Sequence, residues 1–237
     1  MAIKYLDSKR IRGTSTSVFF DSQAYANTAS NGTSLTVDIT IGDNDNRILI
    51  VSAGSYNLSP TISGVTFGSQ SLTKIDDDII ASDGRSYLWY LLAPTVGTDT
   101  ITVTWSGTAG RKGMGGMCFY NAKQTAPVNA QTASSTSGTT AGGDVTPTTA
   151  GSAIVDGMFD ISGSSSRTGN LTAGWTQFIG GNDRGQSSQY SLNPTINSAN
   201  TMEYTLGSGA GWAWVGCEIK CEDASLGNVW VERGTAI

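Results

Sequence analysis

The sequence contains no histidine, and charged residues make up only 14% of its 237 residues. The absence of histidine excludes Ser-His-Asp and Cys-His nucleophile systems and removes the commonest zinc ligand. Glutamate is also scarce, with four copies, whereas Gly, Ser, Thr, Asn and Ala are abundant. This composition disfavours helices and favours short strands joined by tight turns.

Clustered basic charge and long apolar runs are also missing. The net charge of -5 argues against a nucleic-acid partner, because phosphate binding needs clustered Lys and Arg. No apolar run approaches the ~20 residues of a membrane span, and the opening "MAIKYLDSKR" lacks the apolar core of a secretory signal. We therefore expect no membrane insertion, and synthesis in a host cytoplasm without a signal peptide.

Two long stretches of the chain resemble each other. They are "DTITVTWSGTAGRKGMGGMCFYNAK" (99–123) and "NTMEYTLGSGAGWAWVGCEIKCE" (200–222), and each reads as a hairpin with a small-residue turn. Further matches follow in the same order, "RILIVSAG" (47–54) with "SAIVDGMF" (152–159) and "SYLWYLLAPT" (86–95) with "QSSQYSLNPT" (186–195). The sequence therefore predicts two pseudo-repeated halves, about 17–123 and 124–223.

Within each half, apolar residues alternate with polar ones, as in strands that have one dry and one wet face. Ile101, Val103 and Trp105 share one face, and Val215, Cys217 and Ile219 share another, which leaves Glu218 and Lys220 outside. We predict an all-β fold, a two-sheet antiparallel β-sandwich of the jelly-roll kind. Residues 17–223 would form one sandwich with strands that cross between the halves, and two tandem small domains are the alternative.

Three cysteines are too few for a disulfide framework. Cys118 and Cys217 occupy equivalent places in the two similar stretches, so a bridge between them is geometrically open. We favour free buried thiols for Cys118 and Cys217, and for Cys221 as well.

Exposed aromatic side chains are the feature that a sugar-binding surface needs. The candidates for a glycan-binding site are Tyr56, Trp89, Trp212 and Trp214. Trp212 and Trp214 share a parity with Glu218 and are expected on the wet face. The alternative is that these aromatic residues cover the sheet or fill a contact between subunits.

Acidic residues gather in three predicted loops, where their oxygens resemble a calcium shell. The calcium candidates are Asp43, Asp45, Asp76, Asp77, Asp78 and Asp83. Asp is also an ordinary turn residue, so we predict no metal site and no cofactor. Glu203 and Glu218 are the only glutamates on predicted sandwich strands, and both look like solvated residues, so a carboxylate-pair glycosidase is not expected.

Both terminal segments look like arms outside the sandwich. The first twelve residues hold four basic side chains, Lys4, Lys9, Arg10 and Arg12, in an arm over 1–16 that reads either as a frayed terminus or as a docking segment. Residues 224–237 contain "NVWVE", which reads as a lone strand with Val229 and Val231 on one side and Trp230 on the other. Such a strand needs a sheet edge, on its own sandwich or on a neighbouring copy, and we favour the neighbour.

The opening "MAIKYLDSKRIRGTS" resembles the start of virion and tail-associated proteins of phages and archaeal viruses. The run "YLWYLLAPTVGTDTITVTWSG" is similar to an uncharacterised family of lectin-like, jelly-roll β-sandwich proteins in phage genomes. This resemblance implies a non-enzymatic structural protein of a virion or extracellular filament that assembles with copies of itself and with other virion proteins. The alternative is a carbohydrate-binding module or adhesin for host-surface glycans.

Overall fold

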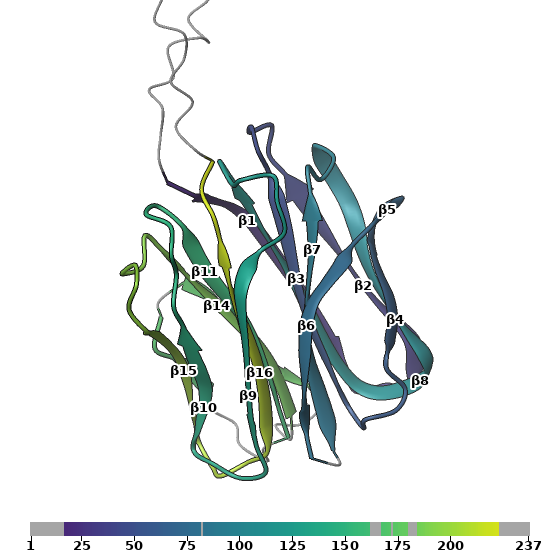
Figure 1. Ribbon diagram of the computed structural model, residues 1–237. Coiled ribbons are helices and arrows are strands. Elements are labelled where there is room, and N and C mark those ends of the chain that lie inside the picture. Colours follow the sequence, from purple (N-terminus) through teal and green to yellow (C-terminus); the bar gives the residue numbers. More distant parts are fainter. Residues whose placement is uncertain (1–16, 82, 162–166, 172, 180–183, 223–237) are drawn as a thin grey trace, which may run out of the picture.

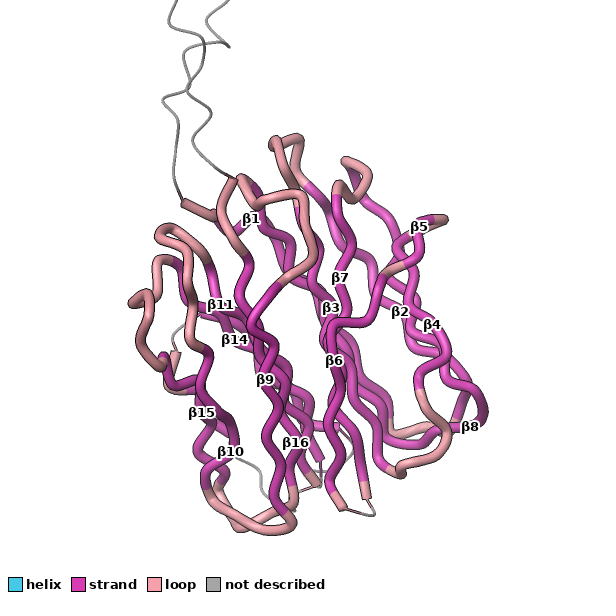
Figure 2. The backbone as a smooth tube through the Cα atoms, viewed as in Figure 1, coloured by secondary structure: helices cyan, strands magenta, loops and turns pink. Residues whose placement is uncertain are grey.

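The computed structural model describes residues 17–81, 83–161, 167–171, 173–179 and 184–222. The described residues form strands and loops without a helix, as Figure 2 shows. All strand pairs are antiparallel, and the sheets pack face to face, so the prediction of an all-β antiparallel sandwich is confirmed. No described helix is long and apolar enough to cross a membrane.

The strands fall into two halves. The first half contains β1 (Phe19–Thr28), β2 (Gly32–Ile41), β3 (Ile48–Tyr56), β4 (Ile62–Phe67), β5 (Gln70–Ser71), β6 (Thr73–Ile80), β7 (Gly84–Leu92) and β8 (Gly97–Tyr120). The second half contains β9 (Val128–Ser135), β10 (Thr140–Val145), β11 (Ala153–Asp160), β12 (Arg167–Gly169), β13 (Ala173–Ile179), β14 (Arg184–Leu192), β15 (Asn200–Leu206) and β16 (Trp212–Ile219).

Each half builds an inner and an outer sheet, so the molecule has four layers (Figure 1). The inner sheets have the orders β1-β8-β3-β7-β6 and β9-β16-β11-β14-β13. The outer sheets have the orders β2-β8-β4-β5 and β10-β15-β12. The layering therefore differs from the expected pair of sheets with crossing strands, because every sheet takes its strands from one half.

The inner sheets pack against each other, which places β6 on β9 and β1 on β13. An apolar cluster with Ile50, Leu88, Phe119, Val155 and Val215 fills this contact. Each half has a further apolar cluster between its inner and outer sheet. As a result β3, β11 and β16 are covered on both faces, and all residues of β11 and β16 are buried.

The two similar stretches are not hairpins. In the first half, β8 continues through "SGTAG" and bends, pairing with β2 and β4 before the bend and with β1 and β3 after it. In the second half, β15 lies in the outer sheet and β16 in the inner sheet, with residues 207–211 between them. The small residues therefore allow the chain to change layers instead of forming a tight turn.

Lys112 holds the bend of β8. Its Nζ donates hydrogen bonds to the carbonyl oxygens of Ser30 at 3.2 Å, Gly32 at 2.9 Å and Ala109 at 2.7 Å. The ammonium also lies 5.6 Å from the centre of the Trp105 ring, within the range of a cation–π contact. Burial lowers the pKa of Lys112. The three carbonyls compensate for the loss of water around this charge.

Several local features recur at matching places in the two halves. Thr100 Oγ1 donates to Asp38 at 2.6 Å across β8 and β2, and Thr201 Oγ1 donates to Asp144 at 2.7 Å across β15 and β10. Ala93 and Asn193 both have a positive φ, 47° and 55°, after the strands β7 and β14. These features and the shared strand order support the hypothesis of a duplicated half.

All three cysteines are free and buried, as favoured from the sequence. Cys118 lies between the two sheets of the first half, whereas Cys217 lies between the two inner sheets. Burial raises the pKa of both thiols well above the usual range. The strand register makes Met117, one residue before Cys118, the counterpart of Cys217, which explains why the two cysteines do not meet.

Candidate functional site

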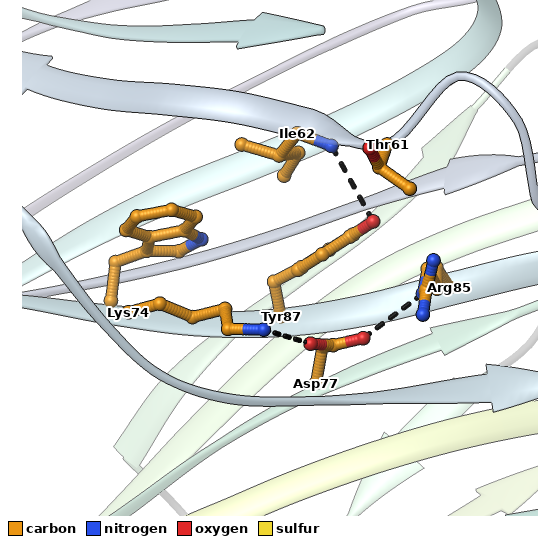
Figure 3. Close-up of a pocket in the computed structure, with 7 residues that line it drawn as sticks. Thr61, Ile62, Lys74, Asp77, Arg85 and Tyr87 are labelled. Atoms are coloured by element: carbon orange, nitrogen blue, oxygen red, sulfur yellow. Dashed lines mark hydrogen bonds and ion pairs between the residues drawn. The ribbon is translucent and has the colours of Figure 1, made fainter. Parts of the chain in front are cut away.

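A pocket of about 280 Å³ opens on the first half, between β4, β6 and β7 (Figure 3). Thr61 and Ile62 line it from the start of β4, Lys74 and Asp77 from β6, and Arg85, Tyr87 and Trp89 from β7. The strands β4 and β5 end the outer sheet on one side, and β6 ends the inner sheet. The pocket therefore lies where the two sheets of the first half are open at their edges.

The alternation of β7 and a bulge in β6 bring the lining side chains together. Successive odd positions of β7 share one face, which places Arg85, Tyr87 and Trp89 in a row. On β6, Lys74 pairs with Trp89 and Asp77 pairs with Tyr87, with a register shift between them. Residues three apart on a regular strand face opposite sides, so the extra residue at this bulge turns Lys74 and Asp77 to the same face.

Charged groups lie at the mouth of the pocket. The Asp77 carboxylate contacts the Lys74 ammonium through one oxygen, and its other oxygen lies 3.0 Å from Arg85 Nε. The Arg85 contact is an ion pair and not a hydrogen bond, because Arg85 Nε has no partner at hydrogen-bond geometry. The Lys74 and Arg85 side chains are 46% and 27% exposed, whereas Asp77 is 13% exposed. Two cations therefore share one carboxylate, and both keep further donors for a ligand.

Aromatic side chains form the floor of the pocket. The Tyr87 hydroxyl oxygen accepts a hydrogen bond from the Ile62 main-chain nitrogen at 3.4 Å, which leaves its proton available to donate. Burial raises the pKa of Tyr87, so the phenol is neutral at physiological pH. The Trp89 side chain is 9% exposed, and its Nε1 is buried without a hydrogen-bond partner. An unpartnered buried donor is costly, so Trp89 Nε1 is a candidate donor for a ligand or a bound water.

The structure changes the interpretation of the four aromatic candidates. Trp89 lines the pocket and belongs to the first-half core, and Tyr56 is half-buried beside a small cluster at Phe159. The placement of Trp212 and Trp214 on a wet face was wrong, because they are 9% and 0% exposed. Both lie on β16, which has a sheet on each side. An open stacking surface made of these four side chains is therefore not present.

The acidic calcium candidates are distributed over two connecting segments and a strand. Asp43 and Asp45 lie between β2 and β3, Asp83 lies between β6 and β7, and Asp76, Asp77 and Asp78 lie within β6, where a loop was expected. Asp76 and Asp78 each accept a hydrogen bond from the next main-chain nitrogen. Within the described part of the chain, no three His, Cys, Asp or Glu side chains gather to hold a metal ion.

A second polar cluster, which the sequence did not reveal, surrounds Asp156 on β11. The fully buried Asp156 carboxylate accepts hydrogen bonds from Tyr204 Oη at 2.7 Å, Trp214 Nε1 at 2.7 Å, Gln189 N at 2.8 Å and Gln189 Nε2 at 3.3 Å. Burial raises the pKa of Asp156 to about 7, against these hydrogen bonds, which lower it. The cluster fills the space between the two sheets of the second half, so it serves the core and offers no open site.

Glu218 was also expected in solvent and is instead fully buried. Its carboxylate accepts from Asn129 Nδ2 at 2.7 Å, Thr148 N at 3.0 Å and Thr149 N at 2.9 Å, and so fixes the segment before β11. The error has the same cause as for Trp214, because both faces of β16 are covered. Glu203 is exposed on β15, as expected.

The candidate assembly residues lie outside the described residues. They are Lys4, Lys9, Arg10, Arg12, Val229, Trp230 and Val231. Comparison of the chain with protein-family models, with curated proteins and with solved structures finds no match. The chemistry of the pocket therefore carries the functional argument.

Proposed function

We propose that this protein is a non-enzymatic carbohydrate-binding module that recognises its ligand in the pocket of the first half. The observation that carries the proposal is the set of donors around that pocket, which includes the unpartnered Trp89 Nε1 and the exposed cations Lys74 and Arg85. Saccharides are rich in oxygen acceptors, and the pocket volume of about 280 Å³ suits one sugar unit.

Binding without catalysis fits the residues present. The chain has no histidine, and the seven lining residues include a single carboxylate, Asp77, which is held between two cations. A glycosidase generally uses two carboxyl groups on either side of the bond that it cleaves. Glu218, one of the two glutamates considered for that role, is engaged by main-chain and side-chain donors.

Binding to immobilised neutral and acidic glycans tests the proposal. The full chain is expected to bind a subset of them, and Lys74→Gln is expected to weaken that binding by about tenfold, since a charge-assisted hydrogen bond is lost. Lys220→Gln changes the net charge equally but lies after β16, away from the pocket, and serves as the matched control. Absence of binding to every glycan, or equal binding by both variants, contradicts the proposal.

A second candidate function is that of a structural protein of a virion or extracellular filament, which assembles with copies of itself and other virion proteins. One observation favours it: the Asn121 side chain donates to the Ser17 carbonyl at 2.7 Å, and the Asn121 carbonyl accepts from Glu222 N at 2.9 Å. The described chain therefore starts and ends at one place on the body (Figure 1). The flanking segments 1–16 and 224–237 would tether the body from that end.

The pocket and the tether are compatible, because they lie apart. Ile48 pairs with Phe119 near Asn121. Trp89 pairs with Val51 and Arg85 with Ser55, three and seven residues further along β3, or about 10 and 23 Å away at 3.3 Å per residue. Sedimentation of the intact chain and of chains without 1–16 or 224–237 tests the assembly. Oligomers that are lost on truncation support it, and equal sedimentation of all three chains contradicts it.

A further inference from the structure

We propose that the ligand of the pocket is an acidic sugar, a uronic or sialic acid unit, whose carboxylate lies between Lys74, Arg85 and the Trp89 indole. This inference rests on the proposed function, because it names the chemical class of the saccharide. It follows from three properties of the pocket: its hydrogen-bond balance, its local charge and the replacement of its β7 side chains at the matching places of β14.

The hydrogen-bond balance favours a ligand with at least one group that only accepts. Lys74 and Arg85 together carry eight N–H donors. The Asp77 carboxylate contacts one nitrogen of each side chain, and Trp89 Nε1 has no hydrogen-bond partner. The only carboxylate of the lining, Asp77, already faces both cations. A neutral sugar hydroxyl donates as well as accepts, and the acceptors in the lining are the Thr61 and Tyr87 hydroxyls and Asp77, which are fewer than the donors. A carboxylate accepts at both oxygens and matches the donors.

The local charge favours an anion in the same place. Two cations and one carboxylate leave a surplus of one positive charge at the pocket, on a chain whose net charge is -5. The neighbouring acids Asp76 and Asp78 pair with Leu88 and Ser86 and so face the other side of β6. Lys74 is 46% exposed and Arg85 27%, which allows both side chains to adjust to a ligand without disturbing the core. Such a site attracts an anion and repels a cation at short range.

The described residues of β14 do not repeat the β7 side of the pocket. Ile50 pairs with Tyr90 and Val155 pairs with Tyr190, so each residue of β7 has its counterpart one hundred positions later on β14. Trp89, Tyr87 and Arg85 are therefore replaced by Gln189, Ser187 and Gly185. Gln189 donates hydrogen bonds from its main-chain nitrogen and from Nε2 to the Asp156 carboxylate. The chain is expected to bind one acidic sugar per molecule.

Calorimetric titration of the full chain with glucuronate, glucose, glucuronamide and acetate tests the inference. Glucuronamide keeps the shape of glucuronate without its charge, and acetate supplies a carboxylate without a ring. Glucuronate is expected to bind with one site per chain, at least tenfold tighter than the other three. Its affinity is expected to fall about tenfold in Lys74→Gln and in Arg85→Gln, to fall with added salt, and to be unchanged in Lys220→Gln.

Each other outcome overturns a defined part of the account. Equal binding of glucose and glucuronate that is lost in Lys74→Gln overturns the acidic class and leaves the carbohydrate site in place. Acetate binding as tightly as glucuronate overturns recognition of the sugar ring. Glucuronate binding that is the same in Lys74→Gln and Lys220→Gln places the ligand elsewhere, and no binding of any saccharide, here or on immobilised glycans, overturns both proposals.

Discussion

The two halves share a strand order but differ in what fills equivalent positions. In the first half, Val51 pairs with Trp89 across β3 and β7, and both belong to an apolar core that ends at the open pocket. In the second half, the counterparts are Asp156 and Gln189, which bind each other and close the interior with polar contacts. The same strand order thus carries an open pocket in the first half and a buried polar network in the second.

The two halves therefore place opposite demands on their polar residues. A pocket at the sheet edge needs charged residues that remain partly in water, as Lys74 and Arg85 do. A buried polar network stabilises only if all of its members are satisfied, and the four hydrogen bonds to Asp156 meet that condition. The first half is therefore expected to tolerate polar substitutions at its pocket, and the second half is not.

The largest expected effect contrasts an arginine of each half. The Arg167 and Asp160 side chains form an ion pair with 0% exposure on either side, whereas Arg85 pairs with Asp77 at the surface. Arg167→Ala removes the cationic partner of a buried carboxylate and is expected to lower the free energy of unfolding by about 3–5 kcal/mol. Arg85→Ala is expected to lower it by less than about 1 kcal/mol. Urea unfolding of both variants measures the contrast, and equal losses would contradict it.

The next prediction concerns pH and the second half alone. Burial raises the pKa of Asp156 to about 7, above the ordinary aspartate value of 3.8, so the folded state holds this proton more tightly than the unfolded state. Its contribution to stability is therefore fully present below about pH 4 and is lost as the pH rises to 7. The loss is on the order of 4 kcal/mol, at 1.36 kcal/mol for each unit of pKa shift.

Unfolding of the intact chain and of Asp156→Asn between pH 4 and 8 isolates this contribution. The intact chain is expected to lose more stability over the interval than the variant, whose side chain does not titrate. A parallel pH dependence of the two proteins would show that Asp156 is ionised in the folded state throughout.

The contact between the halves gives a smaller effect. A Cβ added to Gly157 on β11 would lie 2.6 Å from Ser52 Cβ on β3, across the two inner sheets, whereas a Cβ at Gly64 on β4 meets nothing within 4 Å. Gly157→Ala is expected to lower the free energy of unfolding by about 1–3 kcal/mol through overpacking. Gly64→Ala, the matched control, is expected to change it by less than about 0.5 kcal/mol. Thermal unfolding of the two variants distinguishes packed inner sheets from loosely tethered halves.

The smallest effect concerns the cross-strand Thr–Asp hydrogen bond that is present at matching places in both halves. Thr100→Val and Thr201→Val each remove one cross-strand hydrogen bond to an aspartate, Asp38 or Asp144. Each change is expected to cost about 0.2–1 kcal/mol, and the two costs should agree within error, because the pairs have the same geometry and position. Chemical denaturation measures them. A clear inequality would show that the shared strand order does not extend to shared energetics.

The sequence predicted the class of the fold because composition and period-two patterns depend on local chemistry. The alternation of Ile101 and Val103 is present in the structure, with both side chains buried. Alternation failed on β16, because a strand with a sheet on each face buries both parities, and Trp214 and Glu218 were misplaced as a result. The sequence around Glu218 does not indicate that a second sheet covers this face of β16. Nor does it indicate that Asn129, Thr148 and Thr149, far away in the chain, bind the Glu218 carboxylate.

The pocket was beyond prediction for a related reason. Trp89 was among the candidates, but its neighbours Lys74 and Asp77 were not recognised as residues on one face. Their common orientation depends on the bulge in β6, and one inserted residue reverses every later side chain of a strand. Alternation assumes an uninterrupted register, so a site built on a bulge is invisible to it.

The central claim, that the first half binds an acidic sugar through donors that include Trp89, is tested most directly by the indole resonances of the six tryptophans. In ¹H–¹⁵N spectra assigned with Trp89→Phe, the account predicts that glucuronate shifts the Trp89 Nε1–H signal saturably. The Trp214 signal, whose proton is bound to Asp156, should stay in place. A Trp89 signal that does not move while glucuronate binds would contradict the claim.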